Sequence, residues 1–172
     1  EEEQLEVYKA VVDLVKSRIE KAKSFGKRQK TKGGIDIDAL VKTMMNKIGE
    51  ETLGKYYREK ILSQKQLHTK KLPKHSEKIL TEQDLYGWRL YSGKKHIQCE
   101  TEYEARYLKV WLEAGLDRVK IPKDEKYLET ILPELESLKI RIDEIVNSYL
   151  ESILDPKTRT KIEHQLWQEI LK

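Results

Sequence analysis

Two stretches of the chain space their apolar residues so regularly that each predicts a long α-helix with one apolar face. Steps of three and four residues alternate through the first stretch, which contains Leu5, Tyr8, Val12, Val15, Ile19 and Ala22. The same steps recur over about 20 residues through Leu135, Leu138, Ile142, Ile145, Tyr149 and Ile153. An α-helix makes one turn about every 3.6 residues, so residues with this spacing lie on one face of the helix. The chain is therefore expected to be mainly helical.

The two apolar faces can be buried in two ways. If the two long helices pack against each other, both faces are buried without a partner, and we prefer this interpretation. The alternative is that they pack against another subunit or against the rest of a larger parent chain. A coiled coil of only about three heptads would be marginal alone.

Residues 1–64 are expected to form an N-terminal helical region that contains a basic loop over residues 23–34. The charges of that loop repel one another, and its glycines favour disorder. After it, Asp36 or Asp38 caps a helix that Gly49 closes, and a further helix follows over about residues 51–62. Residues 65–84 lose the apolar pattern and are rich in Lys, His, Ser and Thr, so we expect a basic linker or an extended arm.

Residues 85–122 are expected to form a small β-β-α-β unit. Apolar residues on both sides of Gly93 are typical of a β-hairpin with glycine in its turn. Thr101 and Glu104 form a capping-box pattern, in which each side chain binds a main-chain amide at the start of a helix. That helix is expected to end at Gly115, and a short strand is expected to follow at residues 118–122.

Residues 123–172 are expected to form a C-terminal helical region. Asp124 starts a short helical turn, and Pro133 suits the first position of the long helix because an amide at that position has no helical partner. Asp155 and Pro156 end that helix and begin the last one. Together these regions predict an α+β fold, mainly α, in which a small β-β-α-β unit is flanked by long amphipathic helices.

The chain has neither the cysteines of a secreted protein nor the apolar runs of a membrane protein. Cys99 is its only cysteine, so no disulfide can form within the chain. No apolar run approaches the roughly 18 residues that a membrane-crossing helix needs, and no signal-peptide core follows the three glutamates at the start. We therefore expect a cytoplasmic protein without a membrane partner.

The sequence contains no motif for catalysis, metal binding or cofactor binding. His96 and Cys99 have the spacing of metal ligands, but on a strand they point to opposite faces, and no second pair completes a four-ligand site. The glycines lack the framework of a phosphate-binding loop or of a dinucleotide-binding fold. Asp124 is better explained as a helix cap than as a nuclease carboxylate. We expect no enzymatic activity, no metal, no cofactor and a buried or semi-buried Cys99 thiol.

Positive charge is concentrated in the middle of the chain. Residues 23–95 contain 18 basic and 8 acidic residues, a net charge of +10, whereas the remaining residues carry a net charge of −6. Basic segments beside aromatic residues are typical of nucleic-acid contacts, because each cation near a phosphate releases a counterion. The alternative is a solvated surface without a partner. The candidate contacts to DNA or RNA are Lys27, Arg28, Lys30, Lys32, Lys70, Lys71, Lys74, Arg89, Lys94 and Lys95.

Three motifs in residues 86–172 are similar to those of a known family. They are GWRLYSGK at residues 87–94, EARYL at residues 104–108 and LPELE at residues 132–136. This half of the chain resembles the C-terminal, non-catalytic target-recognition or helical region of prokaryotic restriction-modification DNA adenine methyltransferases. The catalytic Asn/Asp-Pro-Pro-Tyr motif of that family and its glycine-rich cofactor-binding strand are absent from the sequence. The resemblance therefore implies an accessory or recognition region and assigns no methyl-transfer role to any residue.

Two functions from different classes follow from these observations. The preferred one is a non-catalytic, nucleic-acid-associated accessory or recognition domain of a prokaryotic DNA modification or defence system. The alternative is a helical protein–protein interaction or assembly module without nucleic-acid binding, in which the lysines keep the chain in solution. An enzyme with an unfamiliar site is a third class.

Overall fold

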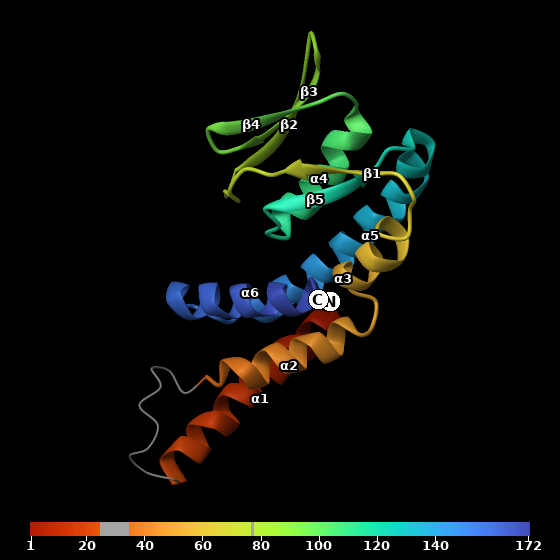
Figure 1. The fold of residues 1–172 in the computed structure, drawn as a ribbon. Coiled ribbons are helices and arrows are strands. Elements are labelled where there is room, and N and C mark those ends of the chain that lie inside the picture. The colour runs from red at the N-terminus through yellow and green to blue at the C-terminus, as the bar shows by residue number, and fades with distance from the viewer. Residues whose placement is uncertain (25–34, 77) are drawn as a thin grey trace. The chain divides into compact units, whose positions relative to one another are not determined.

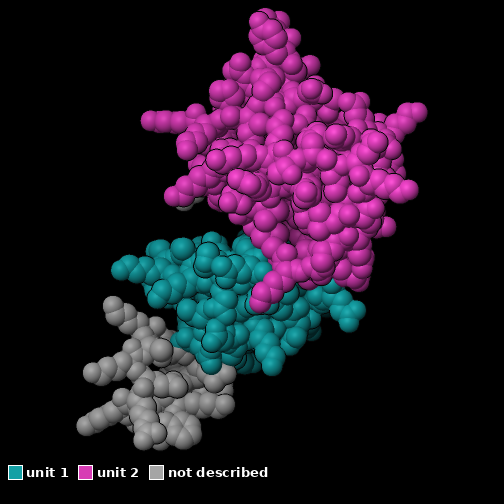
Figure 2. All heavy atoms as spheres, in the orientation of Figure 1, with its two compact units in different colours: residues 1–50, 141–170 teal, residues 51–140, 171–172 magenta. Residues whose placement is uncertain are grey.

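The computed structural model describes residues 1–24, 35–76 and 78–172, with side chains described up to residue 16 in the first of these ranges. These residues are mainly helical and include small antiparallel sheets, which confirms the predicted α+β class (Figure 1). They divide into two compact units, residues 1–50 with 141–170 and residues 51–140 with 171–172 (Figure 2). The helix α5, Glu125–Leu150, contributes residues to both units.

The first unit is helical and is built from α1, Glu2–Ser24, α2, Ile37–Ile48, the end of α5 and α6, Pro156–Ile170. Of the two candidate caps of α2, Asp36 is the one that binds, since its Oδ1 accepts the amide of Ala39 at 3.1 Å. Gly49 ends the helix with a φ of +84°, a conformation that favours glycine. The core of this unit contains the buried side chains Leu40, Val41, Met44, Ile48, Ile162, Leu166 and Ile170.

The two predicted apolar faces differ in how far they are buried. On α5, Leu135, Ile142 and Tyr149 are buried, as the spacing predicts. On α1, the buried side chain is Val11, which lies outside the predicted seam, whereas Leu5 and Tyr8 are 54% and 52% exposed. Val7 and Leu14 on one side of Val11 and the seam residues Val12 and Val15 on the other are all half-buried, so the inward face of α1 is centred on Val11 and includes part of the predicted seam.

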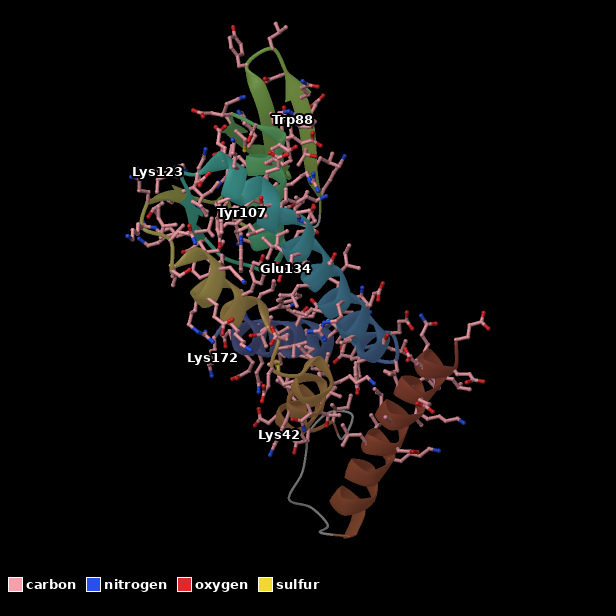
Figure 3. All side chains as sticks on the ribbon, turned by 90° about the vertical axis from the view of Figure 1, so that its right-hand side faces the viewer. Lys42, Trp88, Tyr107, Lys123, Glu134 and Lys172 are labelled. Atoms are coloured by element: carbon pink, nitrogen blue, oxygen red, sulfur yellow. The ribbon has the colours of Figure 1, made fainter. Side chains whose placement is uncertain are left out.

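The second unit contains a three-stranded antiparallel sheet covered on one face by a helix. The strands β2, Ile79–Asp84, β3, Gly87–Ser92, and β4, Lys95–Cys99, lie in the order β2-β3-β4. The helix α4, Glu102–Glu113, packs on the face that carries Leu90 and Cys99, both fully buried. Figure 3 labels Trp88 on β3 and Tyr107 on α4, and so locates the sheet and its covering helix. The predicted hairpin is confirmed, and β2 extends it by one strand.

The predicted strand at residues 118–122 pairs with an element that the sequence pattern does not reveal. This strand, β5, Arg118–Pro122, pairs with β1, Leu67–Lys71, in a separate antiparallel ladder. Residues 65–84 were predicted to be a linker or an extended arm, and the structure instead places both β1 and β2 there. Their side chains are exposed or half-buried throughout, so neither strand produces a run or an alternation of buried apolar residues.

Aromatic side chains attach the β1–β5 ladder to the helices around it. The Tyr107 hydroxyl on α4 donates to the carbonyl of Lys120 at 2.6 Å, and the amide of Lys120 donates to the Tyr57 hydroxyl at 2.8 Å. The ring centroid of Tyr57 lies 5.0 Å from that of the buried Trp111 in an edge-on arrangement. These contacts fix one main-chain unit of β5 from two sides.

The start of α4 uses the predicted capping residues. The Thr101 hydroxyl accepts the amide of Glu104 at 3.1 Å. The Glu104 carboxylate accepts the amide of Glu100 at 2.9 Å, one residue before the amide that a standard capping box binds. Gly115 follows the end of the helix with a φ of +97°.

Two helices differ from their predicted form. The helix expected over about residues 51–62 is α3, Leu53–Tyr56, followed by a π-helical turn, η2, Tyr57–Ile61. The short turn at Asp124 and the helix expected from Pro133 are one continuous helix, α5. Pro133 has no amide hydrogen, so the carbonyl four residues before it has no helical partner. Because Pro133 is exposed, water can reach this carbonyl, and the helix tolerates the proline.

Candidate nucleic-acid interface

The turn between β3 and β4 is joined by hydrogen bonds to the segment that precedes β2. The Ser92 hydroxyl donates to the carbonyl of Lys74 at 2.7 Å, and the amide of Gly93 donates to the carbonyl of Lys78 at 2.9 Å. Gly93 has a φ of +63°, which suits the first position of a two-residue hairpin turn. Two basic stretches that are separate in the sequence therefore meet at one end of the sheet.

This arrangement gathers five lysines, which we call the basic edge: Lys71, Lys74, Lys78, Lys94 and Lys95. All five are exposed. Within the described residues, no carboxylate lies within salt-bridge distance of any of them. Glu77, the acidic residue of the same stretch, lies outside the described residues. Exposed cations gathered in this way create a local positive potential that attracts anions.

A shallow surface hollow of about 370 Å³ is lined in part by two lysines of the basic edge, Lys71 and Lys95. Its lining comes from two segments, Lys71, Leu72 and Pro73 on one and Lys95, His96 and Ile97 on the other. Among these lining residues, Leu72 is buried, and the side chains of His96 and Ile97 point to opposite faces of β4. The ring of His96 also lies against the ring of Tyr91, with their centroids 5.6 Å apart.

Lys70, a predicted contact, is engaged in an ion pair inside the second unit. Its Nζ donates to Oε1 of Glu104 at 2.8 Å and to the carbonyl of Gln98 at 3.1 Å. The side chains of Lys70 and Glu104 are only 26% and 10% exposed. Lys70 therefore joins β1 to the start of α4, and its charge is already balanced.

Arg89, another predicted contact, is balanced in a similar way. Its Nε lies 2.6 Å from Oδ2 of Asp84 and donates to Oε1 of Gln98 at 3.2 Å. Partial desolvation acts against ionisation of Asp84, but the amide of Tyr86, the amide group of Gln98 and the Arg89 charge together lower the pKa of this carboxyl. The three side chains form a polar group on the sheet face opposite α4.

The ten predicted contacts thus fall into three groups. Four of them, Lys71, Lys74, Lys94 and Lys95, belong to the basic edge. Two more, Lys70 and Arg89, are held in ion pairs. The remaining four, Lys27, Arg28, Lys30 and Lys32, lie outside the described residues.

Sequence reasoning missed two members of this surface. Lys78 belongs to the basic stretch of residues 65–78, but only its hydrogen-bonded approach to Gly93 places it beside the hairpin turn. His96 was considered as a metal ligand, and the structure places it beside the hollow, with its ring against Tyr91 on the sheet face opposite α4. A signal for both exists in the sequence, because Lys78 lies four residues after Lys74 and His96 directly follows Lys95.

Three further features bear on the chemistry of the chain. No group of three or more metal-ligating side chains occurs within the part of the chain that the structure describes. The Cys99 thiol is buried, as predicted, and this burial together with the nearby Glu104 charge raises its pKa to about 11. Among the described residues, no helix is both long enough and apolar enough to cross a membrane.

Comparison with known proteins gave no match to a family model, to a curated protein or to a solved structure.

Proposed function

We propose that the chain is a non-catalytic, nucleic-acid-associated accessory or recognition domain that contacts phosphates through the basic edge. The observation that carries this proposal is the convergence of five exposed lysines without carboxylate partners among the described residues. A phosphate backbone presents closely spaced negative charges and matches such a surface. The resemblance of residues 86–172 to the accessory regions of DNA adenine methyltransferases favours a role in prokaryotic DNA modification or defence.

The proposal predicts binding that weakens steeply with salt. Each phosphate contact contributes about 0.7 to 0.9 to the slope of log affinity against log salt, so five contacts give a slope of about −3.5 to −4.5. Fluorescence anisotropy with a labelled oligonucleotide, repeated across a salt series, measures this slope. The double variant Lys94→Gln/Lys95→Gln should make it shallower by about 1.4 to 1.8.

The matched control is Lys161→Gln, which removes an exposed lysine from α6 in the other unit. It should leave the slope unchanged. An equal loss of slope in the control and in the single variant Lys95→Gln would show that net charge, rather than the basic edge, governs binding. The absence of binding at low salt would contradict the proposal.

A helical assembly module is the second candidate. It is favoured by the exposure of Leu5 and Tyr8 on α1, which leaves part of the predicted seam uncovered within the described residues. Sedimentation velocity over a range of concentrations tests it. A concentration-dependent oligomer that Leu5→Ser/Tyr8→Ser converts to monomer would support assembly, and a monomer at all concentrations together with salt-dependent oligonucleotide binding would favour the first proposal.

A further inference from the structure

We infer that the sheet face opposite α4 enters the major groove of duplex DNA and contacts base edges there. This inference rests on the proposed function and names the form of nucleic acid that the domain binds. Contacts between the basic edge and phosphates require only exposed cations, whereas the neighbouring sheet face exposes a set of hydrogen-bonding side chains.

One face of the three-stranded sheet carries exposed or half-buried side chains. The helix α4 covers the other face, which carries the buried Leu90 and Cys99. Because successive residues of a strand point to opposite faces, the pairing register places two cross-strand rows on the open face. The first row is Leu80, Tyr91 and His96, and the second row is Glu82, Arg89 and Gln98.

The open face begins beside the basic edge. The pair Tyr91–His96 of the first row lies next to the pair Ser92–Lys95 at the β3–β4 turn, and Lys78 directly precedes β2. Cations for phosphates therefore adjoin the side chains of the open face. In duplex DNA a phosphate strand runs along each side of a groove, so contact between the basic edge and one strand brings the open face over the groove beside it.

The dimensions of the sheet match the major groove of B-DNA. Neighbouring strands lie about 4.8 Å apart, so three strands span about 10 Å. The major groove is about 12 Å wide and about 8.5 Å deep, whereas the minor groove is only about 6 Å wide. The major groove of A-form RNA is too deep and narrow for side chains to read. Duplex DNA is therefore the form of nucleic acid that this face fits.

The second row supplies side chains that can distinguish bases. Arginine pairs with guanine and glutamine with adenine in the major groove. The Nε of Arg89 lies 2.6 Å from Oδ2 of Asp84 and 3.2 Å from Oε1 of Gln98, and the Tyr91 side chain is a further hydrogen-bond partner. A guanidinium has five N–H donors, so these three partners leave donors for a base. They also orient Arg89 before DNA binds, which lowers the entropic cost of the contact.

The acidic side chain in the same row favours bases over phosphates as the partner of this face. Glu82 is exposed and pairs in register with Arg89. A carboxylate repels phosphates, but it can accept a hydrogen bond from the amino group of cytosine. A row that contains both donors and acceptors matches base edges, which also present both.

The test selects bound DNA from a pool of duplexes with about 20 randomised base pairs at about 100 mM salt, and the bound fraction is sequenced. We expect the full chain to enrich a base-pair motif, and the consensus duplex to bind at least about tenfold more tightly than a scrambled duplex. Arg89→Lys and Gln98→Ala should each relax the motif at one position and weaken consensus binding about 5- to 150-fold. Both should leave the salt slope unchanged, because neither alters a charge.

The matched control is Gln83→Ala, which removes an exposed glutamine of β2 that lies on the α4 side of the sheet. It should leave the motif unchanged. Lys95→Gln should make the salt slope shallower and also leave the motif unchanged, since phosphate contacts carry no sequence information.

Steep salt dependence without an enriched motif would overturn the inference and leave the proposed function standing. A motif that both Arg89→Lys and Gln98→Ala leave unchanged would also overturn it, and so would tighter binding of single-stranded DNA or of duplex RNA than of duplex DNA. If no nucleic acid binds at low salt, the proposed function fails together with the inference.

Discussion

Two neighbouring lysines on β1 are expected to respond to the same substitution in opposite ways. Lys70 pairs with the largely buried Glu104, whereas Lys71 is exposed and belongs to the basic edge. Replacing Lys70 by glutamine removes the partner of one carboxylate oxygen, while the other oxygen keeps the amide of Glu100. Because Lys70 is itself 26% exposed, water can reach the vacated position.

The expected cost of Lys70→Gln follows from this geometry. Breaking a fully buried ion pair costs about 3 to 5 kcal/mol. Leaving one buried polar atom unsatisfied costs about 1 to 3 kcal/mol, and the partial exposure of Lys70 places this pair in the lower range. Lys71→Gln alters only the surface and should change the free energy of unfolding by less than about 0.5 kcal/mol.

Urea unfolding monitored by tryptophan fluorescence measures the free energy of unfolding of each variant. Oligonucleotide binding across a salt series measures the effect of each variant on phosphate contacts. Lys71→Gln should make the salt slope shallower by about 0.7 to 0.9, and Lys70→Gln should leave it unchanged. The double variant Lys70→Gln/Glu104→Gln should recover part of the stability, because it removes the unpaired charge. Equal destabilisation by the two lysine variants, or a shallower slope for Lys70→Gln, would refute this division of roles.

Three other substitutions or reactions are expected to give defined results. Gly54→Ala should lower the free energy of unfolding by about 1 to 3 kcal/mol, because a Cβ there would lie 2.5 Å from the main-chain carbonyl carbon of Lys172. Asp36→Ala should cost about 1 kcal/mol by removing the cap of α2, while Asp36→Asn, which still caps, should cost less. With its pKa near 11, the Cys99 thiol should react with a thiol reagent at pH 8 about 100-fold more slowly than after unfolding in urea.

Each of these three predictions has an outcome that would contradict it. A Gly54→Ala protein as stable as the wild type would show that α3 and the residues at 171–172 do not approach each other as described. Equal stability of the alanine and asparagine variants at position 36 would show that the capping hydrogen bond contributes nothing. Equal reaction rates for the folded and unfolded thiol would contradict the burial of Cys99.

The elements that could be predicted are those whose signals lie close together in the sequence. Thr101 and Glu104 are three residues apart and cap α4, and Gly93 lies in the turn of a hairpin that pairs residues on either side of it. By contrast, β1 is defined by pairs such as Leu67 with Pro122, which are far apart in the chain, and its exposed side chains carry no apolar pattern. Strand pairing at such a separation is tertiary information.

The candidate site was predictable as a set of lysines but not as a surface. The charge count identifies a basic region, yet it gives Lys70 and Lys71 the same weight. Only the position of Glu104, which the fold brings beside β1, separates the balanced lysine from the available one. Likewise, the link from Ser92 to the carbonyl of Lys74 joins two segments that local patterning treats as independent.

The hydrogen bonds from the β3–β4 turn to the carbonyls of Lys74 and Lys78 also affect the thermodynamics of binding. Confining the main chain of one residue costs about 1 to 2 kcal/mol of conformational entropy. At these two positions the main chain is already ordered in the folded protein, so binding of a ligand has to order only the lysine side chains. Binding at this end of the sheet should therefore lose less entropy than binding by the same lysines in a peptide. Cleavage of the main chain between the two segments should weaken this binding, although it removes no charged residue.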